Sequence, residues 1–275
     1  MDVKDSPDRS QLIDIWQGSL QGLIDLAEGL DDQDWAQLTP CPGWTVGDLV
    51  AHTTDIEQML AGDPRPQHEP EWDSLPHAMG DVGRFTEVGV DHRRGWSRAD
   101  VIAELRETMA RRRAQIEAVP EGQEVLSPFG RPTSVERLVR VRTLDIWVHE
   151  QDIRQALDRP GDMDSDAAIV TLQQFISGLP KVWAKNTGAP AGAVVHLVIA
   201  DVGRGVEAWA SVDEDGSGVT CDPSAEATVT LTLTWADYLA LSAGREAPTA
   251  VGARVSLAGD ADLGQRLLAS MTQTP

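Results

Sequence analysis

A long apolar stripe with helical spacing opens the chain. Of all the sequence features, it most limits the folds that the chain can adopt. Between Ser10 and Leu30, apolar side chains recur every three to four residues for about six turns, at Leu12, Trp16, Leu20, Leu23, Ala27 and Leu30. This period is that of an amphipathic helix that covers a core along one face. One such helix cannot bury its own stripe, so the chain must supply partners of similar length.

Three further segments up to residue 161 supply those partners. Each begins with a Ser or Thr that has an acidic residue three positions later, which is a helix-capping pattern: Thr45 with Asp48, Ser97 with Asp100, and Thr133 with Glu136. Pro160 and Gly161 end the last helix. Residues 62–96, rich in Pro, Gly, His and acidic residues, are expected to form a long connection. The pattern predicts a four-helix bundle over residues 1–161.

The pattern changes after Asp162. A further amphipathic helix is expected over 166–184, and two apolar segments, 193–200 and 205–212, are expected to form a hairpin. Two more strands, a capped helix after Thr234 and a terminal helix complete the pattern, the expected ranges being 227–234, 234–243, 251–257 and 263–271. Residues 162–275 are therefore predicted to be an α+β domain with a small, mostly antiparallel sheet.

The charge balance restricts the class of partner. The chain has 23 Lys and Arg against 44 Asp and Glu, a net charge of −21, which argues against nucleic acid or an anionic membrane surface. No segment approaches the 18 apolar residues of a membrane-spanning helix. Two cysteines, Cys41 and Cys221, cannot make a disulfide framework. We expect a reduced, cytoplasmic protein that acts on small molecules.

Two histidines in predicted bundle helices are the main candidates for chemistry. His52 lies beside the apolar stripe of the second helix, and His149 lies in the fourth helix, four residues after Asp145. Spacing of four residues puts Asp145 and His149 on one helical face. Two imidazoles and one carboxylate form a catalytic type of zinc site with an open position. An inward Asp145 also needs a cation. The alternatives are a core histidine and a surface Asp–His pair.

Three neighbouring residues have two interpretations each. Asp152 follows His149 by three residues, either as an acceptor that orients the imidazole or as an ion-pair partner at the helix end. Asp48 precedes His52 by four residues and could orient that imidazole in the same way, but its role in capping the helix is favoured. Cys41 lies just before a helix N-terminus, where a thiol pKa can be lowered, so one interpretation is a nucleophilic cysteine. No histidine is near it in sequence, which favours a cysteine without a catalytic role.

Two sequence motifs carry a family resemblance. Cys41-Pro-Gly-Trp-Thr-Val-Gly-Asp-Leu-Val-Ala-His52 and, some ninety residues later, Asp145-Ile-Trp-Val-His149-Glu-Gln-Asp-Ile-Arg154 resemble the mycothiol-dependent maleylpyruvate isomerase family. The resemblance implies a DinB-like metal-binding four-helix bundle followed by a domain similar to sterol carrier protein 2. It implies a divalent metal, usually zinc, held at His52, Asp145 and His149, although the family has Glu at the position of Asp145.

The resemblance also implies a reaction and further site residues. Family members use the thiol of mycothiol, activated by the metal, to isomerise maleylpyruvate from cis to trans. Two arginines serve the anionic substrate or thiol cofactor; one matches Arg245, and Arg84 is the nearest match to the other. We therefore expect an isomerase of this type or a related thiol transferase. A thiol-independent metal hydrolase and a non-catalytic small-ligand carrier are the alternatives.

Overall fold

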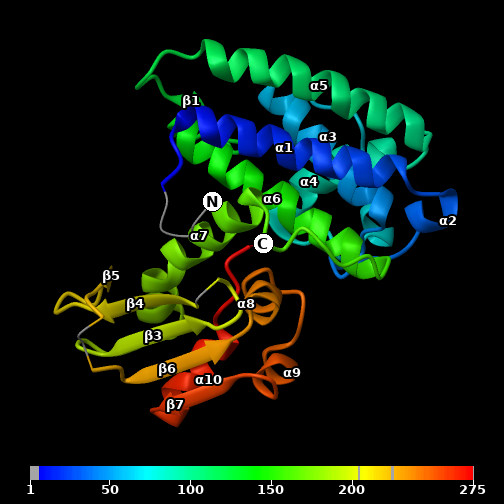
Figure 1. The fold of residues 1–275 in the computed structure, drawn as a ribbon. Helices are drawn as coiled ribbons and strands as arrows, with labels where there is room; N and C mark the ends of the chain where they lie inside the picture. Colours follow the sequence, from blue (N-terminus) through cyan, green and yellow to red (C-terminus); the bar gives the residue numbers. More distant parts are fainter. Residues whose placement is uncertain (1–5, 204, 224–225, 275) are drawn as a thin grey trace. The chain divides into compact units, whose positions relative to one another are not determined.

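The computed structural model describes residues 6–203, 205–223 and 226–274 of the chain (Figure 1). The chain divides into two compact units, residues 1–171 and 172–275. The division falls inside helix α7 (Asp166–Lys181), whereas the sequence pattern places the domain boundary at 161/162, in front of that helix. A helical first unit is followed by a second unit with a sheet, so the α+β class is confirmed.

Long helices form the first unit. Helix α1 (Arg9–Glu28) packs against α5 (Arg98–Ala118) and α6 (Val135–Ala156), and α3 (Val46–Leu60) also packs against α5 and α6. Figure 1 shows these helices as a bundle, with the short α2 (Asp32–Trp35) after α1. The stripe predicted for the first helix is buried throughout, from Leu12 to Leu30.

Side-chain caps set where the bundle helices begin. Thr45 and Asp48 form the predicted capping box of α3, and Ser97 caps α5. The cap expected at Thr133 is wrong by one residue. Ser134 caps α6 instead, because Thr133 is held in a two-stranded hairpin, β1 (Val125–Leu126) with β2 (Pro132–Thr133).

The connection expected over 62–96 contains helical structure. A 3-10 turn, η1 (Trp72–Ser74), is followed by helix α4 (Gly80–Arg93), which packs against α3. Glycine lowers helix propensity and hid this helix from the sequence pattern. Gly89 is nevertheless required, because a Cβ there would lie 2.0 Å from the carboxyl carbon of Asp55 on α3.

The second unit contains a five-stranded sheet in the order β5-β4-β3-β6-β7. Its strands are β3 (Val194–Ile199), β4 (Val206–Val212), β5 (Gly218–Thr220), β6 (Val229–Leu233) and β7 (Ser256–Gly259). The hairpin of β3 with β4 is as predicted, and only the β3–β6 pair of this sheet is parallel.

Helices complete the second unit. A π-helical turn, η2 (Val182–Asn186), follows α7. Helices α8 (Trp235–Ser242) and α9 (Pro248–Gly252) lie between β6 and β7, and α10 (Ala261–Ala269) follows β7. The strand expected over 251–257 is wrong in its first half. Pro248 favours the first turn of a helix, so α9 occupies residues up to Gly252 and β7 begins at Ser256. Among the described residues, no helix is long and apolar enough to cross a membrane.

Candidate metal centre

Helices α3 and α6 bring the three predicted metal ligands together. His52 on α3 and Asp145 and His149 on α6 each offer a donor atom, and these atoms all lie within 4.8 Å of one another. The Nε2 of His52 is 3.4 Å from one Asp145 oxygen, and the Nε2 of His149 is 3.8 Å from the other. Both Nε2 atoms thus face the carboxylate between them.

Neighbouring side chains orient the two imidazoles. The Nδ1 of His149 lies 3.1 Å from a carboxylate oxygen of Asp152, which makes this nitrogen the donor, so that Nε2 is the ring nitrogen that faces Asp145. Arg154 pairs with Glu150 at 2.7 Å. The indole of Trp44 packs on both imidazoles, with ring centroids 5.0 Å from His52 and 6.1 Å from His149.

Trp44 is itself held by a buried carboxylate of α4. Its Nε1 donates a 2.7 Å hydrogen bond to Glu87, which is fully buried. Glu87 also pairs with His77 at 3.0 Å and with Arg94 at 2.6 Å, and Arg94 reaches Asp48. The helix that the sequence pattern missed therefore fixes the aromatic wall of the centre.

Arg142 is the cation that accompanies Asp145. Arg142 lies one turn before Asp145 on α6, and its Nη1 donates a 2.8 Å hydrogen bond to the Asp145 carboxylate. Burial opposes ionisation of Asp145, but the charge of Arg142 above all outweighs it, and the pKa of this carboxyl is held well below its usual range. Burial lowers the pKa of His52, in spite of Asp145. At neutral pH the centre holds a carboxylate and a neutral His52 imidazole.

Arg142 also connects the centre to a second buried group. Its Nε donates a 2.7 Å bond to Glu57 of α3, which is fully buried and receives a 3.5 Å hydrogen bond from the Trp16 indole. Sequence reasoning missed Arg142. Its spacing of three residues from Asp145 was a signal, but its partner Glu57 is 85 residues away in the chain.

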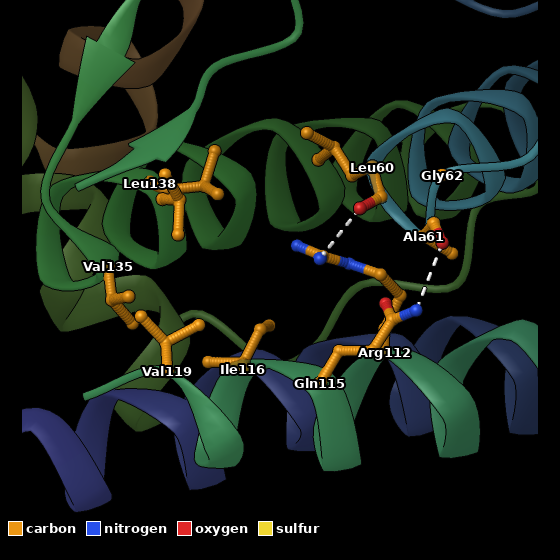
Figure 2. Close-up of a pocket in the computed structure, with 10 residues that line it drawn as sticks. Leu60, Ala61, Gly62, Arg112, Gln115, Ile116, Val119, Val135 and Leu138 are labelled. Carbon is orange, nitrogen blue, oxygen red and sulfur yellow. Dashed lines mark hydrogen bonds between the residues drawn. The ribbon is translucent and has the colours of Figure 1, made fainter. Parts of the chain in front are cut away.

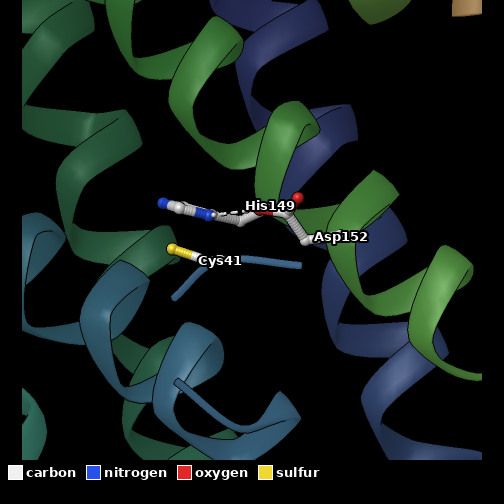
Figure 3. Close-up of side chains that lie close together, drawn as sticks. All are labelled: Cys41, His149 and Asp152. Carbon is white, nitrogen blue, oxygen red and sulfur yellow. Dashed lines mark hydrogen bonds and ion pairs between the residues drawn. The ribbon is translucent and has the colours of Figure 1, made fainter. Parts of the chain in front are cut away.

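A thiol lies beside the centre. The sulfur of Cys41 and donor atoms of His149 and Asp152 form a second group within 4.8 Å (Figure 3). The loop before α3 carries Cys41, so the histidine that was absent from its sequence neighbourhood comes from α6. Cys41 is partly buried. This group shares His149 with the first one.

The first donor set suits a divalent metal. Two imidazole nitrogens and one carboxylate oxygen are a common catalytic zinc set, which leaves a fourth position for water or substrate. The imidazole side chains are 6% and 9% exposed, whereas Asp145 is 30% exposed, so the set is accessible from the Asp145 side. The buried Nδ1 of His52 has no hydrogen-bond partner among the described residues. Asp145 reaches both imidazoles although it is shorter than Glu.

Neither of the two expected arginines belongs to the three-residue donor set. Arg84 on α4 is exposed, and its guanidinium lies 5.2 Å from the ring centre of Trp72. Arg245 belongs to the second unit and donates a 2.8 Å bond to the carbonyl of Ala243. Arg142, which the sequence pattern did not single out, donates directly to Asp145 of the donor set.

Comparisons with known proteins agree with these motifs. A search of solved structures finds the mycothiol-dependent maleylpyruvate isomerase and a histidine-to-alanine mutant of it, with TM-scores of 0.56 and 0.57. The sequence identities are 15% and 14%, over 94% of this chain and 95% of each structure. This likeness shows a shared fold.

Sequence comparisons add two relatives and a family. Uncharacterized proteins of Mycobacterium tuberculosis strains CDC 1551 and H37Rv are 27% identical over 125 residues, which is 45% of this chain and only 47% of each relative. Residues 16–154 match the family model of the mycothiol maleylpyruvate isomerase N-terminal domain. Because that match covers half of the chain and contains every residue of the donor set, the chain belongs to the mycothiol maleylpyruvate isomerase family.

Proposed function

We propose that this protein is a metal- and mycothiol-dependent enzyme that isomerises a small electrophile of the maleylpyruvate type, or transfers a thiol to a related one. The observation that carries the proposal is the convergence of His52, Asp145 and His149 within 4.8 Å. Membership of the family supports mycothiol as the thiol. A small-molecule substrate and a cytoplasmic location stay predictions.

The proposed ligands divide the work between charge and geometry. A divalent ion at this site, zinc in our proposal, would lower the pKa of a coordinated thiol, so that a thiolate is available at neutral pH. Asp152 holds His149 in the tautomer that presents Nε2, and Trp44 covers both imidazoles against water. The partial exposure of Asp145 supports access for thiol and substrate from that side.

Positive side chains would bind the anionic groups. We assign Arg245 to a carboxylate of the substrate or of mycothiol, and Arg84 to the substrate, because a planar guanidinium binds carboxylates in a bidentate manner. The net charge of −21 makes such local cations necessary for an anionic substrate. Arg245→Lys keeps the charge but loses the planar fork, so we expect turnover to fall about tenfold or more.

The test is an assay with purified, metal-loaded protein. Maleylpyruvate is incubated with and without mycothiol, and loss of the cis-enedione is followed. We expect turnover only with the thiol. Mycothiol binding without turnover of maleylpyruvate would indicate a thiol transferase for another electrophile. Failure to bind any low-molecular-weight thiol would contradict the proposal and favour the hydrolase or the carrier.

Cys41 provides the matched control. Its sulfur lies near His149 and Asp152, so a protein nucleophile is the specific competitor of an external thiol. If mycothiol is the nucleophile, Cys41→Ala should retain thiol-dependent turnover. If turnover disappears in Cys41→Ala while the metal content stays unchanged, the nucleophile would be the Cys41 thiol rather than mycothiol.

A further inference from the structure

A cavity of about 250 Å³ opens at one end of the bundle, apart from the metal donor set. The end of α3, the last turns of α5 and the start of α6 enclose it, and none of the proposed metal ligands lines it (Figure 2). Its walls are mainly apolar, formed among others by Ile116, Val119, Val135 and Leu138. An engineered apolar cavity of about 150 Å³ binds benzene, so this space is large enough for a small ring.

A single guanidinium enters this apolar space. Figure 2 shows the side chain of Arg112 reaching from α5 between Leu60 and Leu138. Arg112 is only 6% exposed, and its Nη1 donates a 2.9 Å bond to the carbonyl of Leu60. Its Nε is buried and has no hydrogen-bond partner within the part of the chain that the structure describes. A buried cation with an unused donor is costly unless an acceptor reaches it.

The nearby carboxylate gives Arg112 an ion pair but no hydrogen bond at Nε. The closest oxygen of Glu57 is 3.7 Å from Nε, beyond hydrogen-bond range, and the other Glu57 oxygen is bonded to Arg142 at 2.7 Å. Asp145, the second partner of Arg142, also faces His52 and His149. Two buried guanidiniums, Arg112 and Arg142, therefore share the carboxylate of Glu57. Burial lowers the pKa of Arg112 in spite of Glu57.

We propose that this cavity is a second binding site, which takes a small apolar monocarboxylate such as an aromatic or short branched acid. The carboxylate would accept hydrogen bonds from Arg112, since a guanidinium presents donors in the geometry that a carboxylate accepts. The apolar body would lie against Val119, Val135 and Leu138. The polar head and apolar walls are the usual composition of a small-molecule pocket.

The site can be tested without any enzymatic activity. Binding of 4-fluorobenzoate to the full chain is measured by ¹⁹F NMR, with 4-fluorobenzamide as the uncharged analogue of the same shape. Metal is removed with a chelator so that the acid cannot bind a metal ion. We expect the acid to bind at least tenfold more tightly than the amide. Equal affinities, or no binding of the acid, would overturn the proposal.

Three variants locate the bound acid. Arg112→Gln should weaken binding of the acid at least tenfold, whereas Arg113→Gln, the next residue on α5, should not change it, because Arg113 pairs with Asp14 and Glu117. Val119→Phe should fill the cavity and remove binding of both probes, and it decides the matter if Arg112→Gln does not fold. Unchanged binding of the acid to folded Arg112→Gln or to Val119→Phe would place it elsewhere and overturn the proposal.

One more variant separates this site from the metal centre. His149→Ala disrupts the proposed metal ligands but touches no wall of the cavity. It should bind 4-fluorobenzoate with unchanged affinity even if the proposed function fails. Loss of the acid in this variant would show that the acid occupies the metal centre and would contradict a separate cavity site.

Discussion

The two units of this protein differ in what they bury. In the first, eleven described charged or titratable side chains are buried: Asp48, His52, Asp55, Glu57, Glu87, Arg93, Arg112, Arg142, His149, Glu150 and Asp152. In the described part of the second unit, Asp237 is the only buried carboxylate, imidazole or guanidinium. There the aromatic residues Phe175, Trp235 and Tyr238 pack against one another.

This difference indicates where the chemistry lies. A four-helix bundle can be held by apolar stripes alone, and replacing buried ion pairs by apolar residues is often neutral or stabilising. We therefore infer that the charges of the first unit serve a purpose other than stability. Some of them adjoin His52, Asp145 and His149: Asp152 contacts His149, and Arg142 links Asp145 to Glu57, as expected for a preorganised site.

Removing the central charge should have the largest effect on stability. Glu57→Gln leaves Arg142, and Arg112 beyond it, without their buried carboxylate, so we expect a loss of about 3–5 kcal/mol in the free energy of unfolding. Urea unfolding followed by circular dichroism measures it. Glu207→Gln in the second unit removes an exposed partner of His196 and should cost less than about 1 kcal/mol. Equal losses would remove the contrast between the units.

A smaller effect is expected at the proposed ligand Asp145. Asp145→Asn keeps the shape but removes the charge, so metal affinity should fall at least tenfold, measured by competition with a coloured chelator. Asp145→Glu restores the residue of the family pattern and should retain more affinity than Asn. Asp237→Asn, which alters the buried carboxylate of the second unit, serves as the control. An unchanged affinity in Asp145→Asn would make Asp145 merely a partner of Arg142.

The smallest effect is the pH dependence from His52. Burial lowers its pKa in the folded protein, so below pH 6.5 the unfolded chain takes up a proton that the folded chain does not. The contribution of His52 to the free energy of unfolding should thus decrease as the pH falls below 6.5. In chelator-treated protein, the difference between wild type and His52→Gln should shrink from pH 7 to pH 5. A difference that grows would mean a raised pKa.

The helices of the bundle were predictable because their signals are local. Thr45 and Ser97 cap their own helices, and the stripe from Leu12 to Leu30 needs only helical periodicity. Helix α4 was missed because Gly89 lowers local propensity for a tertiary reason, the close approach of Asp55. Pairing of β7 also depends on a distant strand, β6, so its start was placed too early.

The proposed centre was predictable only in part. Helical spacing placed Asp145 and His149 on one face. That His52 would join them was predicted because a bundle core brings ligands from facing helices together, and the family motif agreed. An inward Asp145 needs a cation, but that cation need not be a metal ion, because Arg142 on the same helix also pairs with it. Glu57, Glu87 and Trp44 complete the surroundings through contacts across helices, which spacing within one helix does not contain.

The central claim is that the charged core of the first unit holds a divalent metal. Elemental analysis of protein purified without chelator tests it most directly, in the wild type and in a His52→Ala/His149→Ala double variant, with His196→Ala as the control from the second unit. The account predicts one divalent ion per chain, most of it zinc, in the wild type and the control, and less than a tenth of that in the double variant. Stoichiometric metal in a folded double variant, or a metal-free wild type that takes up no added zinc, would contradict it.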